Sequence, residues 1–166
     1  MSDKIKIDVK PDKEDYRMLM QAFKVMPKEA QKELRASNKR QMTTLANKIK
    51  SAARNGKSNN QQELVAKSIR ANSDRFPSII IGGSRLARVS RKVTAKSPRP
   101  AIGQLVFGVE FGAGDTKNGR LPNGVRRFPT RSKVGYFIFP TLKRNQERIR
   151  QDYLETVYKL LKKRWG

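Results

Sequence analysis

The residue best suited to acid–base chemistry is Glu110, a carboxylate that lies between Val109 and Phe111 in an otherwise apolar stretch. An apolar setting raises the pKa of a carboxyl group and can turn it into a general acid. Acid–base or metal catalysis usually needs further ionisable groups beside the first. Here Asp115 is the nearest other carboxylate, and the chain contains no histidine and no cysteine. We therefore predict no catalytic residue and no metal ligand. We interpret Glu110 as structural, paired with an arginine of its own or a neighbouring subunit.

Two glycine-containing segments resemble phosphate-binding loops only in part. Gly56-Lys57-Ser58 matches the end of such a loop, but Ser51 stands where the first glycine belongs, and a helical pattern precedes it instead of a strand. Gly112-Ala113-Gly114-Asp115 could offer backbone amides to a phosphate, although a lone glycine-rich turn is weak support for a nucleotide site. We interpret the first as a helix end with a linker and the second as the root of a loop. No cofactor is expected.

A basic loop at about 113–133 is the main candidate for an interaction site. It contains one aromatic residue, Phe128, and no acidic residue after Asp115. Its six basic residues are Lys117, Arg120, Arg126, Arg127, Arg131 and Lys133. A loop of this length in a compact domain indicates either function or disorder. Such a loop could follow a nucleic-acid backbone while Phe128 stacks on a base, or it could dock on an acidic protein surface, and the sequence favours neither.

The chain of 166 residues carries a net charge of +24, and the excess is spread along it. Residues 1–60, 61–100 and 101–166 contribute +8, +7 and +9. A spread excess of this size indicates a whole domain that works beside polyanions or acidic proteins, and it exceeds the roughly 2–8 charges that keep small domains soluble. No apolar run approaches the roughly 18 residues of a membrane span, and the polar start of the chain predicts no secretory signal.

The first half of the chain reads as one strand followed by helices. Residues 4–10 alternate between apolar and polar side chains, which predicts a half-buried strand. Apolar residues at helical spacing predict helices over 13–25 and 28–54, with a break at Pro27, and a short helix over 62–70.

In the second half, residues 78–83 predict a buried strand, because they form a short β-branched run bounded by glycines. Residues 101–111 fit a helix better than a strand, 134–139 predict a strand, and 140–163 predict a long final helix. Six aromatic residues of this half are candidate core residues: Phe107, Phe111, Phe128, Tyr136, Phe137 and Phe139. We therefore expect a single α+β domain over 1–166, in which a long N-terminal helical region and a long C-terminal helix pack on a small, mainly antiparallel sheet.

Four short motifs resemble those of one protein family. They are Leu64 or Val65 with Ser68-Ile69, then Ile79-Ile80-Ile81-Gly82, then Val109-Glu110-Phe111-Gly112, and finally Phe139-Pro140-Thr141-Leu142 before a long charged helix. Together they are similar to the small neck proteins of long-tailed double-stranded DNA phages, which are often called minor tail, head–tail joining or tail-completion proteins. The resemblance covers about residues 28–164, with Thr141 where alanine is usual. In this pattern Glu110, Gly112, Phe139 and Pro140 are structural motif residues.

The resemblance implies a structural virion protein without catalytic activity, made in the host bacterial cytoplasm. Its copies would form a ring, of six subunits by our expectation, at the head–tail junction. That ring would complete the tail and join it to the filled capsid, against connector, head-closure, tail terminator or tail tube proteins, with packaged DNA passing close by. One alternative is a tail terminator that caps the tube. An alternative of another class is a nucleic-acid-binding protein without sequence preference.

Overall fold

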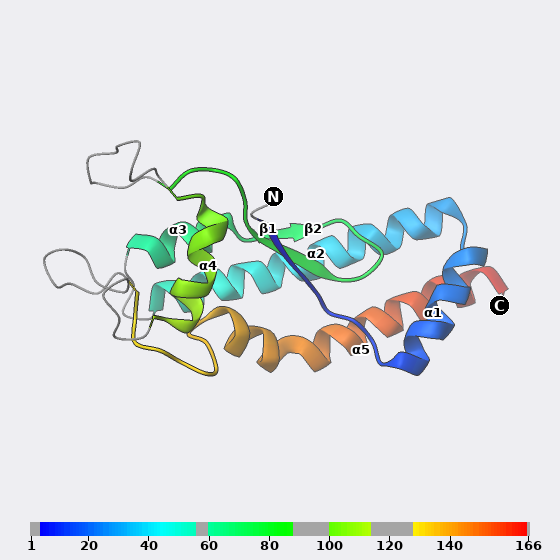
Figure 1. The fold of residues 1–166 in the computed structure, drawn as a ribbon. Coiled ribbons are helices and arrows are strands. Elements are labelled where there is room, and N and C mark those ends of the chain that lie inside the picture. The colour runs from blue at the N-terminus through cyan, green and yellow to red at the C-terminus, as the bar shows by residue number, and fades with distance from the viewer. Residues whose placement is uncertain (1–3, 56–59, 88–99, 114–127, 166) are drawn as a thin grey trace, which may run out of the picture.

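The computed structural model describes residues 4–55, 60–87, 100–113 and 128–165. Two long antiparallel helices, α2 (Lys28–Asn55) and α5 (Ile138–Trp165), lie side by side and form the frame of the molecule (Figure 1). The other helices are α1 (Lys13–Val25), α3 (Asn60–Ser68) and α4 (Ile102–Phe111). The helix α1 lies at one end of the frame, while α3 and α4 lie at the other.

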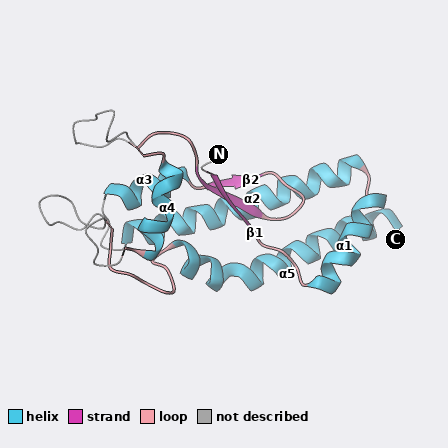
Figure 2. Cartoon of the chain, viewed as in Figure 1, coloured by secondary structure: helices cyan, strands magenta, loops and turns pink. Residues whose placement is uncertain are grey.

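A three-stranded antiparallel sheet lies against α2 (Figure 2). Its strands are β1 (Lys4–Asp8), β2 (Arg70–Asn72) and β3 (Ser78–Gly82), in the order β1-β3-β2. The central strand β3 is buried except at Ile80, which is half-buried, and its Ile79 stands opposite Ile7 of β1. The predicted α+β class is confirmed, with a small antiparallel sheet, a long N-terminal helical region and a long C-terminal helix.

Apolar side chains gather in two clusters along the helical frame. The larger joins the sheet, the second half of α2, helices α3 and α4, and the start of α5, with Ile49 and Ile81 fully buried. The smaller joins α1, the start of α2 and the second half of α5, where Phe23 and Tyr153 are buried. Arg150 of α5 holds the start of α1 by ion pairs to Asp12 and Asp15.

Most predicted elements are present, but the structure corrects several expectations. Residues 134–139 do not form a strand: Gly135 has φ +82°, and α5 begins at Ile138. The short strand β2 was not predicted. Of the six aromatic residues expected in the core, Phe137 is fully buried, but Phe107 is 62% exposed, Phe139 is 42% exposed and Tyr136 is 41% exposed.

Candidate functional site

Glu110 lies at the end of α4 with its carboxylate completely buried against the start of α5. One carboxylate oxygen, Oε2, accepts hydrogen bonds from the backbone N–H groups of Phe137 at 3.2 Å and Ile138 at 2.9 Å. The other, Oε1, accepts one from the N–H of Phe139 at 2.8 Å. The first N–H groups of a helix have no partner within the helix, so a carboxylate at this position satisfies them and complements the helix dipole. Glu110 therefore caps α5 from another helix.

The electrostatic setting of Glu110 contains two opposing effects. Burial raises the pKa of its carboxyl above the ordinary value, and the N–H groups of Ile138, Phe139 and Phe137 oppose that rise. Burial is the larger effect, because water is removed from the charged form. Within the described residues the partners of Glu110 are backbone groups, and the arginine that the sequence led us to expect is not among them.

Glycines allow the chain to approach this cap closely. Gly112 ends α4 with φ +73°, and a Cβ there would collide with the carbonyl oxygen of Thr130. Gly135 has φ +82°, and a Cβ there would collide with the Glu110 carboxylate. The N–H of Ser132 donates to the carbonyl of Phe111 at 2.7 Å, which holds the segment before α5 against the end of α4. The two motifs that lie far apart in sequence thus form one joint between α4 and α5.

A ridge of three phenylalanine side chains runs over this joint, in which Phe107 and Phe139 are exposed and Phe111 is half-buried. The rings of Phe107 and Phe111 are 6.4 Å apart between centroids, and those of Phe111 and Phe139 are 5.2 Å apart. We call these three residues the aromatic ridge. Contiguous exposed apolar surface on a soluble protein typically marks an interaction site. The ridge is therefore the first part of a candidate functional site.

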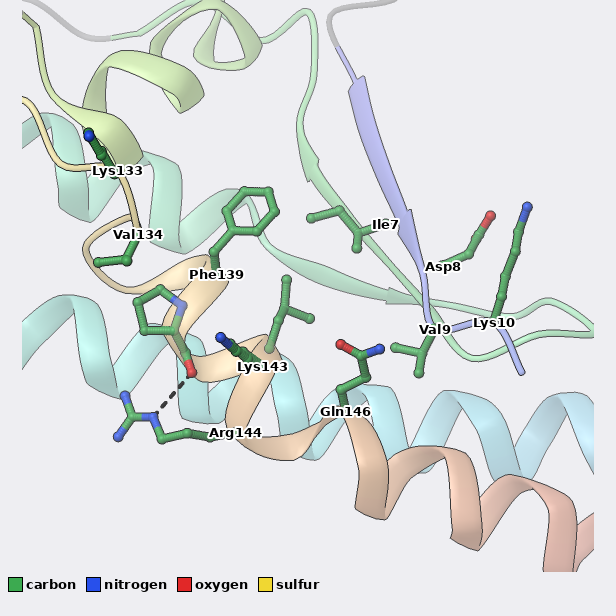
Figure 3. Close-up of a pocket in the computed structure, with 12 residues that line it drawn as sticks. Ile7, Asp8, Val9, Lys10, Lys133, Val134, Phe139, Lys143, Arg144 and Gln146 are labelled. Atoms are coloured by element: carbon green, nitrogen blue, oxygen red, sulfur yellow. Dashed lines mark hydrogen bonds between the residues drawn. The ribbon is translucent and has the colours of Figure 1, made fainter. Parts of the chain in front are cut away.

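Beside the ridge lies a groove of about 770 Å³ between β1 and the first turns of α5 (Figure 3). Phe139 belongs to both, so the ridge and the groove are continuous. Ile7 from β1 and Phe139 from α5 point toward one another across it, as Figure 3 shows. Its apolar lining is completed by Val9, Val134, Pro140 and Leu142. Val134 is 74% exposed, so a large aliphatic side chain faces solvent at the edge of the groove.

Four cations line the groove: Lys10, Lys133, Lys143 and Arg144. Asp8, the one acidic residue of the lining among the described residues, is paired with Lys6 at 3.3 Å. Arg144 donates from Nε to the carbonyl oxygen of Pro140 at 3.1 Å, as the dashed line in Figure 3 marks. Within the part of the chain that the structure describes, none of the four cations has a carboxylate partner. The groove thus combines an apolar interior with positive charge.

The structure places only two of the six predicted interaction residues. Arg131 and Lys133 are exposed in the segment before α5, and Lys133 lines the groove. Lys117, Arg120, Arg126 and Arg127 lie outside the described residues. The cations Lys10 and Lys143 were not singled out from the sequence, because they are separated by more than a hundred positions and only the fold brings them to one groove.

Among the described residues, no three acidic side chains are grouped so that they could hold a metal ion. No described helix is long and apolar enough to cross a membrane. No known protein family, curated protein or solved structure matches the chain.

Proposed function

We propose that this chain is a structural protein of the phage neck, which forms a closed ring at the head–tail junction and joins the tail to the DNA-filled capsid. The proposal starts from the motifs around Glu110 and Phe139. The observation that carries it is the apolar surface at those motifs, where the aromatic ridge and Val134 are left uncovered by the described residues of the chain.

An uncovered apolar ridge is expected in a protein that buries this surface against other proteins when it assembles. A ring at the junction contacts the neck proteins on either side of it as well as its own subunits, and apolar side chains at either kind of contact become buried. The net charge of +24 suits contact with acidic neck proteins and with the phosphates of packaged DNA, held without reading its sequence. In this proposal the chain acts by assembly and carries out no catalysis.

The decisive experiment removes the coding sequence from the phage genome and examines the products by electron microscopy. The proposal expects DNA-filled heads and tails of normal length that remain separate, and it expects joining to return when the chain is supplied from a plasmid. Tails of irregular length would instead identify a tail terminator. Infectious particles that lack the chain would refute a structural role in the neck.

A second measurement separates the neck protein from a nucleic-acid-binding protein. The purified chain is examined for rings by light scattering and negative-stain microscopy, and its affinity for duplex DNA is measured over a range of salt. Rings with weak binding to DNA are expected. A monomer that binds DNA strongly, with affinity that falls steeply as salt rises, would favour the nucleic-acid-binding alternative.

A further inference from the structure

We infer that the groove between β1 and α5 binds a short, extended, acidic segment of a partner protein, one that places apolar side chains against Phe139 and carboxylates beside the four lining cations. The inference deepens the proposed function, because it gives the chemical character of one neighbour in the neck. It can nevertheless be tested on the purified chain alone.

The apolar lining decides what kind of molecule fits. Ile7, Val134 and Leu142 offer only hydrocarbon, and Phe139 offers a ring that is 42% exposed. A DNA duplex presents phosphates and mainly polar base edges to a protein, and the thymine methyl group is the one apolar group on those edges. A peptide can place leucine, valine or phenylalanine side chains there and remove apolar area from water. The lining therefore favours a protein segment over nucleic acid.

The charges around the groove indicate that the bound segment is acidic. Lys10, Lys133, Lys143 and Arg144 surround the groove without carboxylate partners among the described residues, and Asp8 is already paired with Lys6. Complementary charges at the rim of an interface increase the association rate and exclude partners of like charge. A second copy of this chain, with its own excess of +24, is disfavoured as the occupant.

The position of β1 indicates that the bound segment has an extended conformation. The strand lies at the edge of the sheet, with β3 on its other side, and the consecutive residues Ile7 to Lys10 at its end line the groove. Edge strands offer backbone N–H and C=O groups to an added strand, while adjacent pockets select its alternate side chains. An extended segment that alternates apolar and acidic residues would pair with the backbone of β1, place its apolar side chains in the groove and place its carboxylates beside the cations.

The test measures binding of the purified chain to fluorescein-labelled peptides by fluorescence polarisation. The probe peptide alternates Glu with Leu and Phe. One comparison peptide has Lys in place of Glu, and another has Ser in place of Leu and Phe. We expect the probe to bind and each comparison peptide to bind at least about tenfold more weakly, a difference of about 1.4 kcal/mol.

Matched variants locate the binding on the molecule. The double variant Lys10→Glu with Lys143→Glu reverses two groove cations, and Lys39→Glu with Arg40→Glu makes the same charge change at exposed positions of α2. The groove pair should weaken probe binding about tenfold or more, while the α2 pair should change it by less than about twofold. Equal losses in the two pairs would refute a specific groove and reveal a nonspecific charge effect.

An apolar pair of variants tests the hydrocarbon contact. Val134→Ser removes an exposed side chain of the groove, and Val25→Ser removes an exposed valine at the end of α1. Only the first should weaken probe binding. Groove variants that abolish binding of duplex DNA and leave peptide binding unchanged would overturn the inference in favour of a nucleic-acid contact.

The same groove can be examined in particles with a photo-crosslinking amino acid at position 134. Crosslinks that map to an acidic segment of another particle protein are expected, and crosslinks to DNA or to a second copy of this chain would overturn the inference. Particles that contain the chain without such crosslinks would also overturn it, although the proposed function would stand. Absence of the chain from particles would refute the proposed function, while the peptide measurements would still decide the inference.

Discussion

Replacing Glu110 with Gln should destabilise the fold by weakening the cap of α5. The carboxylate offers two oxygens to three backbone N–H groups, whereas an amide offers one oxygen and turns an NH₂ group toward the remaining donors. A buried donor left without an acceptor costs about 1–3 kcal/mol. Removal of a buried carboxylate offsets part of that loss. We therefore expect a net loss of about 2 kcal/mol, or about 4–8 °C in melting temperature for a domain of this size.

The difference in stability between the wild type and Glu110→Gln should also depend on pH. Burial raises the pKa of Glu110, so the folded chain holds this proton at a pH where the unfolded chain has lost it. The contribution of Glu110 to stability is therefore complete below its unfolded pKa and decreases as the pH rises through its folded pKa. The advantage of the wild type over Glu110→Gln should accordingly be larger in acid than at neutral pH.

Urea unfolding followed by circular dichroism at several pH values measures both effects. Glu33→Gln is a suitable control, because Glu33 is an exposed carboxylate of α2 and its replacement should change the unfolding midpoint little. Two results would refute the reasoning. One is a midpoint of Glu110→Gln equal to that of the wild type. The other is a wild-type advantage that grows with pH, which would mean that the N–H donors outweigh burial.

Three further substitutions test the packing at separate places. Gly112→Ala should lower the melting temperature, because a Cβ at φ +73° collides with a carbonyl oxygen, and little loss would show that the turn can relax. Asn38→Ala should cost about 1–3 kcal/mol in urea unfolding, because the buried amide donates to the carbonyl groups of Asp74 and Arg75 at 3.0 and 2.8 Å. Tyr153→Phe should leave thermal stability unchanged or raise it by about 1 kcal/mol, since the buried hydroxyl has no hydrogen-bond partner among the described residues; a clear loss would indicate an unrecognised bond.

Local patterns predicted the elements whose structure depends on their own residues. The alternation in 4–10 indicated β1, and the apolar spacing together with Pro27 indicated α1, the break and α2. The final helix expected over 140–163 is also present, and Leu142, Ile149 and Val157, which recur at helical spacing, are buried. In these segments the period of the apolar residues and the backbone preference favour the same structure, so the local sequence predicts the element correctly.

The failures arise where a distant residue decides the local structure. Residues 134–139 consist of strand-forming side chains and one glycine, yet α5 begins at Ile138 because Glu110 accepts hydrogen bonds from the N–H groups of three successive residues there. Likewise, the polar segment β2 has little strand preference of its own and forms beside β3, where Ala71 stands opposite Ile79. Neither partnership leaves a signal in the adjacent sequence.

The candidate site was predictable only in part for a related reason. The sequence drew attention to Glu110, Gly112, Phe139 and Pro140, but it did not indicate that they meet. Their aromatic neighbours were expected in the core because aromatic residues bury large apolar areas, and only the arrangement of α4 against α5 leaves Phe107 at the surface.

The first turn of α5 has two separable roles, because its backbone and side chains face different partners. The N–H of Phe139 donates inward to Glu110, while its ring faces outward into the groove and the aromatic ridge. A change at Glu110 should therefore alter stability first and affect peptide binding only through the position of the turn. A change at Val134, which is largely exposed, should alter binding while leaving stability nearly intact. Stability and the proposed partner binding therefore depend on different atoms of one short segment, so substitutions there can separate the two effects.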